Sequence, residues 1–428
     1  MRWGSIITIL VFYIFSVLEV FMIYAAIMGH GTVGSGVAEL LICNNDRISS
    51  RIKGDIEVKY ILDLRDFDGL SYSDRFIKDF SVIKNDPDVK IVVEVMGGLH
   101  PAYDFVKDCL MCGKSVVTSN KELVAAKGAE LLKIAEEKNV NFLFEASVGG
   151  GIPIIRPMAQ CLAANEIQSV TGILNGTTNY ILNKMIVDNM DFNAALKLAQ
   201  DNGFAEKDPA ADIEGHDACR KICILAALAF GKHVYPEQVT CEGITDITLD
   251  DVELADNFNC VIKLIGHAAR LEDGKITASV RPTVVSRENV LSGVHGVFNA
   301  ITVNGDATGD VMFYGKGAGK MPTASAVVAD VIDCAKHISA RKYLGWEEGS
   351  DDYVVTPDTD TRLYVYAKAE NFDALVKSFN DAFDGVSCVK NAYKGEIAFI
   401  TDTAKESYLR EKISGLAADS VKILNTLF

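Results

Sequence analysis

Apolar residues in the first third of the chain form short runs that alternate with amphipathic, helix-like stretches. Residues 23–28 are the first such run, and a glycine-rich turn and a helical pattern over residues 35–41 follow it at once. Strands that alternate with helices predict a parallel sheet covered on both faces, which is a doubly wound α/β fold. The other predicted strands are residues 58–64, 91–95, 115–118 and 141–145, and the other predicted helices are residues 101–112 and 122–138.

The pattern changes after the glycine run Val148-Gly-Gly-Gly-Ile-Pro153, which we interpret as a hinge into a second domain. Strands and helices do not alternate regularly there, which predicts an α+β domain. A second glycine cluster, Gly315-Lys-Gly-Ala-Gly319, precedes a helix over residues 323–337 whose alanines and valines suit packing against the first domain. The predicted strands of this part are residues 169–174, 239–242 and 275–284, and its predicted helices are residues 194–199, 218–230 and 251–264.

From about Pro357 the order is strand, helix, two strands, helix, strand, which predicts a small ferredoxin-like module. Its elements are residues 362–367, 372–382, 388–392, 396–401, 404–416 and 421–424. The chain as a whole is therefore predicted to have an apolar extension (1–21), a nucleotide-binding domain (22–150, completed by about 315–345), an α+β substrate-binding and dimerisation domain (151–314) and the module (357–428).

The bulk composition is that of a globular protein with two or three domains. The chain has 428 residues, of which 49% are hydrophobic and 23% charged. Its formal net charge of −16 opposes contact with phosphate backbones, so we expect no nucleic-acid partner. The one close cysteine pair, Cys109 and Cys112, has no second pair to complete a zinc site. We expect reduced, buried cysteines in a cytoplasmic protein.

The amino terminus departs from this picture, because residues 6–18 are uncharged and mostly apolar. This run is too short for the ~30 Å hydrocarbon core of a membrane. Extending it to residue 28 would consume the strand at residues 23–28. We therefore expect that translation starts at Met22 and that residues 1–21 are not part of the working protein. A membrane anchor through residues 6–28 is the alternative.

The turn Gly29-His-Gly-Thr-Val-Gly34 stands between a strand and a helix, as in dinucleotide-binding, Rossmann-type folds. Gly29 permits the tight turn, Gly31 lets the backbone approach a pyrophosphate, and Gly34 lets helix and strand pack closely. At the end of the next strand, Asp63 suits a ribose 2′-hydroxyl and Arg65 suits a 2′-phosphate. The choice between NAD and NADP stays open.

A polar stretch from Gly203 to Lys221 crowds acids ahead of a lysine that opens an apolar helix. Asp217 and Lys221 are four residues apart, so they share a helix face. One ammonium among carboxylates suits binding an amino acid and moving a proton. The alternative is an exposed ion-pair cluster at a helix start, where the helix dipole favours acids. The other polar residues of the stretch are Glu206, Asp208 and Asp212, which lie on a loop broken by Pro209, and His216, which we interpret as a polar loop residue.

Seven segments of the chain match segments of one known enzyme family, and they occur in the same order. They are Gly29-His-Gly-Thr-Val-Gly-Ser-Gly36, Val116-Val-Thr-Ser-Asn-Lys121, Phe144-Glu-Ala-Ser-Val-Gly-Gly-Gly-Ile-Pro153, Gly172-Ile-Leu-Asn-Gly-Thr-Thr-Asn-Tyr180, Ala205-Glu-Lys-Asp-Pro209 through Lys221, Gly243-Ile-Thr-Asp-Ile247, and Gly315 to Ala326. With these segments the chain resembles homoserine dehydrogenases from about residue 23 to residue 337.

The resemblance implies an enzyme that interconverts L-aspartate 4-semialdehyde and L-homoserine with NADPH or NADH. It implies a homodimer or homotetramer on the route to threonine, methionine and isoleucine. Lys221 would be the proton donor and acceptor, with Lys121 near the nicotinamide and the substrate. A positioned ammonium suits this reaction, since hydride transfer leaves an alkoxide that needs a proton. The implied substrate-binding residues are Glu206, Asp217, Asp212 and Gly203, and the implied cofactor contacts are Gly29, Gly31, Thr32, Val33, Gly34, Arg65, Gly97, Lys121 and Gly319.

The segment from Glu145 to Ile152 offers one carboxylate and a glycine-rich backbone, which can supply hard oxygen ligands to a metal. Taken alone, it reads better as a plain hinge between domains. The resemblance implies a structural monovalent cation, sodium, held by the Glu145 side chain and by the carbonyls of Val148, Gly150 and Ile152.

The carboxy-terminal module resembles an ACT domain, a unit that often senses an amino acid such as threonine. Its usual Asp-x-Pro-Gly-Val signature is replaced by Lys368-Ala-Glu-Asn-Phe-Asp373. This departure argues against threonine as an effector, and a module that serves only in subunit contact is the alternative. Two rival functions for the whole chain are an oxidoreductase for another aldehyde and a non-catalytic amino-acid sensor. The chain keeps Lys121, Lys221 and both glycine clusters, whereas a sensor would have no need of both a hydride donor and a proton donor.

Overall fold

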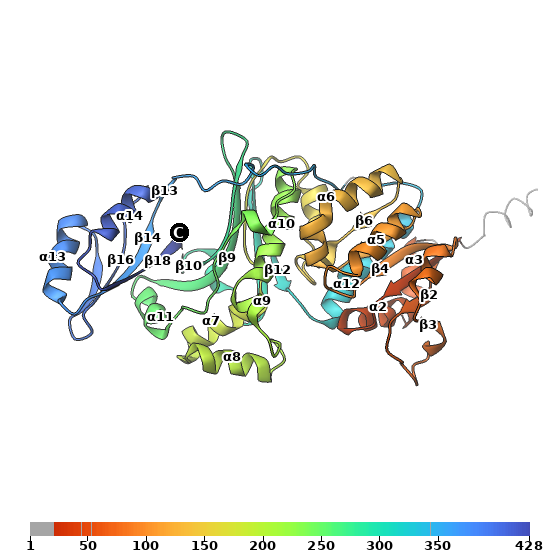
Figure 1. Ribbon diagram of the computed structural model, residues 1–428, viewed down its shortest axis with the longest axis horizontal. Coiled ribbons are helices and arrows are strands. Elements are labelled where there is room, and N and C mark those ends of the chain that lie inside the picture. Colours follow the sequence, from red (N-terminus) through yellow and green to blue (C-terminus); the bar gives the residue numbers. More distant parts are fainter. Residues whose placement is uncertain (1–20, 44, 53, 343) are drawn as a thin grey trace, which may run out of the picture. The chain divides into compact units, whose positions relative to one another are not determined.

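The computed structural model describes residues 21–43, 45–52, 54–342 and 344–428, and it divides into two compact units (Figure 1). The first unit is formed by the described residues up to Leu123, by Glu130–Ser147 and by Gly319–Leu344. The second is formed by Val124–Ala129, Val148–Ala318 and Gly345–Phe428. The boundary after Ser147 lies at the predicted hinge. The predicted extension at residues 1–21 lies outside the described residues, except for residue 21.

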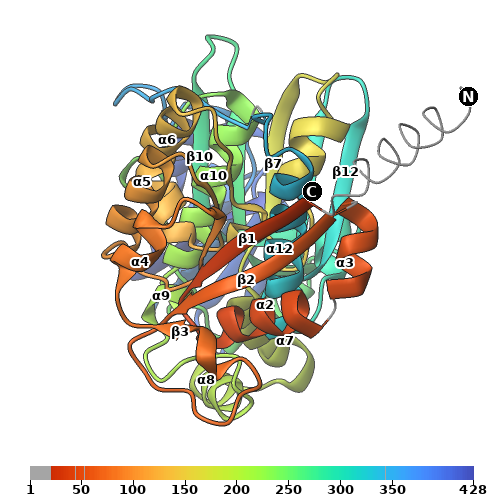
Figure 2. The same ribbon diagram turned by 90° about the vertical axis from the view of Figure 1, so that its right-hand side faces the viewer.

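The first unit holds a six-stranded parallel sheet in the order β3-β2-β1-β4-β5-β6. Figure 2 shows β3, β2 and β1 of this sheet. This order is that of a doubly wound, dinucleotide-binding sheet, whose switch point lies between β1 and β4. Residues 25–28 of β1 are fully buried, because both faces of the sheet are covered. The predicted Rossmann-type fold is therefore confirmed. The strands are β1 Phe21–Met28, β2 Gly54–Leu62, β3 Phe76–Ile77, β4 Val89–Glu94, β5 Ser115–Thr118 and β6 Phe142–Leu143.

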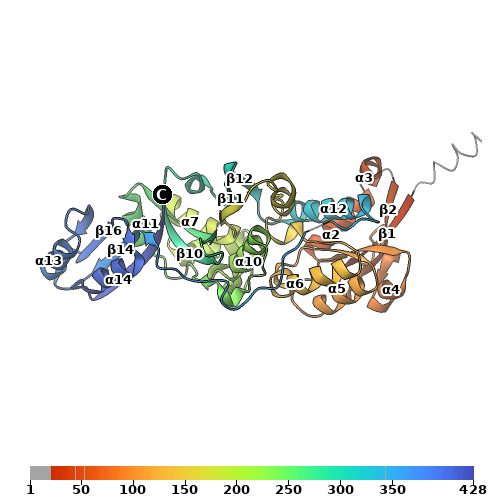
Figure 3. The same ribbon diagram turned by 90° about the horizontal axis from the view of Figure 1, so that it is seen from above.

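Helices lie on both faces of this sheet, with α2, α3 and α12 on one face and α4, α5 and α6 on the other (Figure 3). Helices α2 and α12 approach closely at Gly36, where a Cβ atom would lie 2.9 Å from that of Ala324. The return of the chain through α12 therefore completes the first unit. The helices are α2 Thr32–Cys43, α3 Asn45–Ile52, α4 Phe80–Asn85, α5 Ala102–Met111, α6 Lys121–Glu137 and α12 Lys320–Lys336, with 3₁₀ turns at Ser73–Arg75 and Glu145–Ser147.

The second unit is built on one large mixed sheet in the order β12-β11-β7-β9-β10-β18-β14-β16-β15, with β8 paired to β10. Helix α10, His216–Phe230, packs against β7, β9 and β10. Gly266 of β9 leaves room for the Leu174 side chain, which a Cβ atom there would meet at 2.7 Å. The strands are β7 Ile167–Ile173, β8 Thr240–Cys241, β9 Cys260–Arg270, β10 Ile276–Ser286, β11 Phe298–Gly305, β12 Gly309–Lys316, β14 Leu363–Lys368, β15 Cys388–Asn391, β16 Glu396–Ile400 and β18 Ser420–Leu427, and a separate pair is formed by β13 Asp360–Thr361 and β17 Ala404–Lys405.

The last four strands of this sheet and two helices form the predicted ferredoxin-like module. Its strand order β18-β14-β16-β15 is antiparallel throughout, and α13 and α14 pack on it around a core that includes Leu375, Phe379 and Phe399. Strand β18 also pairs in parallel with β10, so the module continues the larger sheet (Figure 1). Its relation to ACT domains stays a prediction. The helices of the second unit are α7 Gly176–Asp188, α8 Phe192–Asp201, α9 Ala210–Ile213, α10 His216–Phe230, α11 Leu249–Asp256, α13 Phe372–Ala382 and α14 Glu406–Ser414, with 3₁₀ turns at Pro236–Gln238 and Val290–Gly293 and a π turn at Pro157–Cys161.

The predicted helix over residues 251–264 is wrong in its second half. Helix α11 ends at Asp256, and β9 begins at Cys260. Asn259 adopts a left-handed conformation with φ of 56°, which interrupts a helix. The apolar run that follows is a strand buried on both faces, and such a run cannot be told from a buried helix by periodicity alone. The sequence prediction also omitted α7, β11 and β12.

Two further expectations can be compared with the described residues. The ten cysteines form no disulfide, but Cys43, Cys112 and Cys161 are exposed, so the expectation that the cysteines are buried is wrong for these three. Among the helices in the described part of the chain, none is long and apolar enough to cross a membrane.

Candidate active site

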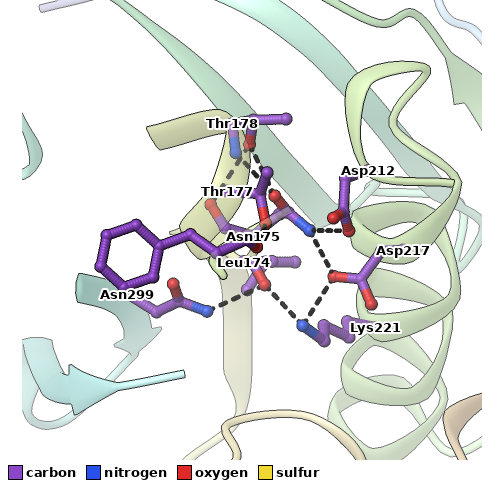
Figure 4. Close-up of polar contacts among 9 residues, drawn as sticks. Leu174, Asn175, Thr177, Thr178, Asp212, Asp217, Lys221 and Asn299 are labelled. Carbon is purple, nitrogen blue, oxygen red and sulfur yellow. Dashed lines mark hydrogen bonds and ion pairs between the residues drawn. The ribbon is translucent and has the colours of Figure 1, made fainter. Parts of the chain in front are cut away.

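The polar cluster around Lys221 is buried at the start of α10. Gly215 adopts φ of 87° directly before the helix, and Asp217 and Lys221 then lie one turn apart. The Lys221 Nζ donates hydrogen bonds to Asp217 Oδ2 at 2.7 Å and to the Leu174 carbonyl at 2.8 Å (Figure 4). Their relative exposures are only 8% for Lys221 and 5% for Asp217. The alternative of an exposed ion-pair cluster is therefore wrong for these two residues.

Asn175 connects this ion pair to a second carboxylate. It is the N-cap of α7, where its Oδ1 accepts from the amide of Thr178. Its Nδ2 donates to Asp212 Oδ1 at 2.7 Å and to Asp217 Oδ2 at 2.9 Å (Figure 4). Both amide hydrogens of Asn175 are thus used to hold two acids side by side. The sequence prediction missed this role, although an asparagine ahead of a helix in Leu174-Asn-Gly-Thr-Thr178 is a capping signal.

The electrostatics of the cluster affect Asp212 most clearly. Burial and the neighbouring Asp217 raise the pKa of the Asp212 carboxyl.

Asn299 also enters the site, because its Nδ2 donates to the same Leu174 carbonyl that accepts from Lys221. The Asn299 Oδ1 is buried and has no hydrogen-bond partner among the described residues. The site therefore combines one buried ammonium, two carboxylates and an amide oxygen that can still accept a hydrogen bond.

Other residues of the polar stretch lie outside the cluster. Glu206 is exposed, and its carboxylate forms no hydrogen bond or ion pair with another described residue. Gly203 is exposed with φ of 71°, Asp208 accepts from the amide of Ala210, and His216 is exposed beside Glu214. Glu206 therefore makes no direct contact with Asp217 in the described part of the chain.

The glycine turn of the first unit has the geometry expected of a dinucleotide site. Gly29 adopts φ of 99°, and a Cβ atom at Gly34 would overlap the Gly29 carbonyl. A Cβ atom at Gly31 would meet nothing within 4 Å, so the backbone is open to a ligand there. Thr32 and Val33 are the first residues of α2 and offer amides of a helix start.

Asp63 and Arg65 follow β2 and bind each other. Arg65 donates from its amide and Nε to Asp63 Oδ1, both at 3.0 Å, and from Nη2 to Oδ2 at 2.9 Å. The amide of His30 also donates to Asp63 Oδ2 at 2.8 Å. These donors, with Arg65 foremost, hold the pKa of Asp63 well below its usual range. The two residues that the sequence offered as alternatives for the ribose therefore form one ion pair.

The ring of His30, inside the glycine turn, packs against aromatic residues of the following loop. Phe67 and Phe76 contact it edge-on at 4.5 Å and 5.0 Å between ring centres, and its Nε2 lies 3.2 Å from the Tyr72 hydroxyl. Burial lowers the pKa of this imidazole. A cavity of about 470 Å³ opens beside the turn, with Gly31, Asp63 and Arg65 in its wall. Together, the turn and this cavity fit a nicotinamide dinucleotide.

The remaining residues implied for the cofactor lie at the carboxyl ends of β4 and β5 and at the start of α12. Gly97 and Gly319 adopt φ of 78° and 126°. Lys121 is the first residue of α6, after the N-cap Asn120. Glu94, which the sequence prediction missed, is fully buried and accepts from the amides of Met96 and Gly97 and from the Thr118 hydroxyl. Glu94 thereby shapes the loop that carries Gly97.

The predicted sodium ligands are divided between the two units. Glu145 is buried in the first unit, where its amide donates to Asp330 Oδ2 at 2.8 Å. Val148, Gly150 and Ile152 belong to the second unit, where Gly150 adopts φ of 56° against the backbone of Gly317. No group of three or more His, Cys, Asp or Glu side chains in the described part of the chain is arranged to hold a metal. The sodium site stays a prediction.

Comparisons with known proteins agree with this geometry. A homoserine dehydrogenase family model matches residues 153–332, and the model of the homoserine dehydrogenase NAD-binding domain matches residues 29–145. The homoserine dehydrogenase of Bacillus subtilis (strain 168) is 43% identical over 382 residues, which are 86% of this chain and 87% of that protein. The chain belongs to the homoserine dehydrogenase family.

Solved structures of homoserine dehydrogenases have the same fold. One from Thiobacillus denitrificans aligns with a TM-score of 0.84 and 35% identity, over 95% of this chain and 98% of that chain. A hyperthermophilic archaeal homoserine dehydrogenase mutant in complex with NADPH aligns with a TM-score of 0.63 and 30% identity, over 73% of this chain and 97% of that chain. The first comparison extends through the carboxy-terminal module.

The residue ranges that the two family models match separate the candidate residues of this homoserine dehydrogenase family member in the same way as the two units do. The NAD-binding match contains the glycine turn, Asp63, Arg65 and Lys121. The other match contains Asn175, Asp212, Asp217 and Lys221. The buried ion pair therefore lies within the match to the homoserine dehydrogenase model and outside the match to the NAD-binding model.

Proposed function

We propose that this chain catalyses the reversible NADPH- or NADH-dependent reduction of L-aspartate 4-semialdehyde to L-homoserine, with Lys221 as the proton donor and acceptor. The observation that carries the assignment of Lys221 is its buried ammonium, which has carboxylate and carbonyl partners. An ammonium group has three N–H bonds, and two of them are directed at Asp217 and the Leu174 carbonyl. The third remains for a substrate oxygen.

A bound nicotinamide cofactor supplies the hydride that reduces the aldehyde carbon. Lys221 stabilises the negative charge that develops on the substrate oxygen and transfers a proton to it, and in the direction of oxidation it takes that proton back. Asp217 keeps the ammonium in place through a hydrogen bond inside a region with little water. Lys121 is proposed to act near the same oxygen or the nicotinamide, as the family resemblance suggests.

The acids of the site have a second role, which is to bind the ammonium group of the amino-acid substrate. Asp212 and Asp217 are held together by Asn175, and two carboxylates near each other attract a cation. Burial, followed by the charge of the neighbouring Asp217, raises the pKa of Asp212, so holding the two carboxylates together here has an electrostatic cost. A substrate ammonium would relieve it. Glu206 is proposed to join them, as the family resemblance suggests.

Arg65 supports a preference for NADP over NAD. The Asp63 carboxylate already accepts four hydrogen bonds from His30 and Arg65, so little capacity remains for a ribose hydroxyl. The Arg65 side chain is 63% exposed and retains donors for a 2′-phosphate. The same pair could still accept NAD through a weaker contact.

The direct test is an assay of the purified chain with L-homoserine and either NADP⁺ or NAD⁺, followed through the absorbance of the reduced nicotinamide. We expect homoserine-dependent reduction of at least one cofactor and none with L-serine or L-malate. Reduction supported equally by L-malate would favour the rival oxidoreductase, and no reduction at all would favour the amino-acid sensor. Addition of L-threonine tests the carboxy-terminal module, and we expect no inhibition.

Three further assignments belong to the proposal. We expect a homodimer or homotetramer, which the exposed apolar side chains of Met312 and Tyr314 on β12 support and light scattering would test. We expect a cytoplasmic location, which the lack of disulfides among the ten cysteines supports. We also expect a structural sodium ion at Glu145, so replacing sodium by a bulky organic cation should lower the thermal midpoint.

A further inference from the structure

Asn299 is a residue of the Lys221 cluster that none of the seven sequence segments contains. It is the second residue of β11, and its side chain is only 2% exposed. Its Nδ2 donates to the Leu174 carbonyl at 2.9 Å, and Lys221 Nζ donates to the same oxygen at 2.8 Å (Figure 4). A carbonyl oxygen has two lone pairs, so these two donors use its whole capacity. Asn299 and Lys221 are therefore connected through one acceptor.

The Leu174 carbonyl belongs to no strand pair in the described part of the chain. Strand β7 ends at Ile173, and the last pair of the ladder between β7 and β11 is Ile173 with Ala300. Helix α7 begins only after its N-cap, Asn175. Leu174 and Asn299 are the next residues beyond the last pair, and the amide side chain takes the place of a backbone donor there. The direction of this carbonyl thus depends on Asn299.

Asn299 is itself held on several sides. Its backbone is paired with Gly315 of β12, and its amide lies against Gly317, where a Cβ atom would be 2.0 Å from Nδ2. The carbonyl of the preceding residue, Phe298, accepts from Asn179 Nδ2 on α7 at 3.1 Å. The fold therefore fixes this side chain before a substrate binds, as accurate orientation of a catalytic group requires.

Stability alone does not favour an asparagine at this position. The Asn299 Oδ1 is buried and has no hydrogen-bond partner among the described residues. A buried acceptor without a partner costs free energy, and a leucine of similar size would not carry this cost. What asparagine adds, and leucine cannot, is the N–H bond directed at the Leu174 carbonyl.

We propose that Asn299 is a positioning residue, which orients Lys221 by fixing the Leu174 carbonyl. The inference rests on the proposed function of Lys221 in proton transfer. A lysine side chain is flexible, and two fixed acceptors, Asp217 Oδ2 and the Leu174 carbonyl, define the direction of its ammonium. The third N–H bond, or the lone pair of the neutral amine, then faces the substrate oxygen. If the carbonyl could turn away, this alignment would be lost, although Lys221 would remain in the site.

Steady-state oxidation of L-homoserine by Asn299→Leu, with the cofactor that the wild type uses better, tests the proposal. Leucine keeps the size of the side chain and removes the donor. We expect kcat to fall about tenfold to hundredfold, because a small misalignment of a reacting group costs this much in rate. KM for homoserine should change by less than about twofold, because the acids that we assign to the substrate ammonium are untouched. A side chain that only supported the fold would not produce this split between kcat and KM.

A matched control is Asn141→Leu. Asn141 is also 2% exposed, and its Nδ2 donates to the Ala340 carbonyl at 3.1 Å within the first unit. This variant should lose stability but keep the wild-type kcat at a temperature below its unfolding transition. If Asn299→Leu does not fold, Asn299→Ala removes the same donor without adding an apolar branch, and we expect the same fall in kcat.

Two results would overturn the inference and leave the proposed function standing. One is a folded Asn299→Leu or Asn299→Ala enzyme that keeps more than about a tenth of the wild-type kcat. The other is a raised KM with unchanged kcat, which would place Asn299 in substrate binding instead. A wild type without homoserine-dependent activity would overturn the proposed function and this inference together, so the wild-type assay distinguishes the two failures.

Discussion

Replacement of Lys221 by alanine should abolish most of the turnover while leaving substrate affinity largely intact. The side chain supplies the only lysine ammonium among the described contacts of the Asp217 cluster, at 2.7 Å from the carboxylate. Its removal takes away the ammonium that we assign as the proton donor to the substrate oxygen. The acids that we assign to the substrate ammonium would remain.

The magnitude follows from two effects of different size. Loss of a positioned general acid and base lowers a rate by about 10²–10⁴-fold, so kcat should fall by this factor. Removal of one partner from a buried ion pair costs about 3–5 kcal/mol of stability. The cost should lie at the lower end, because Asn175 still donates to Asp217 at 2.9 Å. The variant is therefore expected to fold, with a clearly lower thermal midpoint.

The assay is steady-state oxidation of L-homoserine, with kcat and KM determined separately for each variant at a temperature below all the unfolding transitions. Lys197→Ala is a suitable control, because Lys197 pairs with Asp201 one turn away on α8 but is 69% exposed. This variant should keep the wild-type kcat and change stability by less than about 0.5 kcal/mol. A folded Lys221→Ala enzyme with more than a tenth of the wild-type kcat would refute the proposed role of Lys221.

Three other predictions concern separate parts of the molecule. Asn175→Ala should lose about 1 kcal/mol of stability from the missing cap and raise KM for homoserine, whereas Asn371→Ala, at the cap of α13, should lose similar stability with no change in KM. Arg65→Gln should raise KM for NADP⁺ roughly tenfold more than KM for NAD⁺, and equal changes would contradict the proposed phosphate contact. Burial lowers the pKa of Lys263 on β9 to about 8, so the folded chain disfavours the charged form of this lysine. The free energy of unfolding should therefore rise as the pH increases from the pKa in the folded chain toward the higher pKa in the unfolded chain. The free energy of urea unfolding of the wild type, relative to that of Lys263→Met, should increase by about 2 kcal/mol between about pH 7 and pH 9.5. A difference between the two proteins that does not change with pH would contradict this prediction.

The nucleotide-binding unit was the easiest part to predict from the sequence. Its strands are apolar along their whole length because both faces are covered, and glycine is required where the chain turns sharply at Gly29. These are local requirements, so they leave a local signal. The strand β5 was predicted with the bounds that the structure has, and β1 and β4 differ by two residues or fewer at each end.

The second unit was harder, because its elements are specified by distant contacts. Strand β9 lies between β7 and β10, and the resulting burial of both faces removed the alternation that would have distinguished it from a continued α11. Strands β11 and β12 are also paired across the sheet, and no turn signal strong enough to predict them was recognised.

The candidate site shows the same division between local and distant information. The pairing of Asp217 with Lys221 follows from helix geometry alone, and the structure confirms their contact. The link through Asn175 does not, because Asp212 is 37 residues away from it along the chain. A capping signal predicts that this asparagine holds its own helix, but only the fold reveals which acids its amide reaches.

The parallel pairing of β18 with β10 has a consequence for any shortened form of the chain. Removal of the module would turn residues 283–285 of β10 into an open edge, and Val284 and Val285 are fully buried in the intact chain. Unpaired backbone next to apolar side chains invites strand addition between molecules, which leads to aggregation. Whatever ligand the module does or does not bind, it protects the sheet from self-association. A truncated enzyme that precipitates would therefore say nothing about regulation.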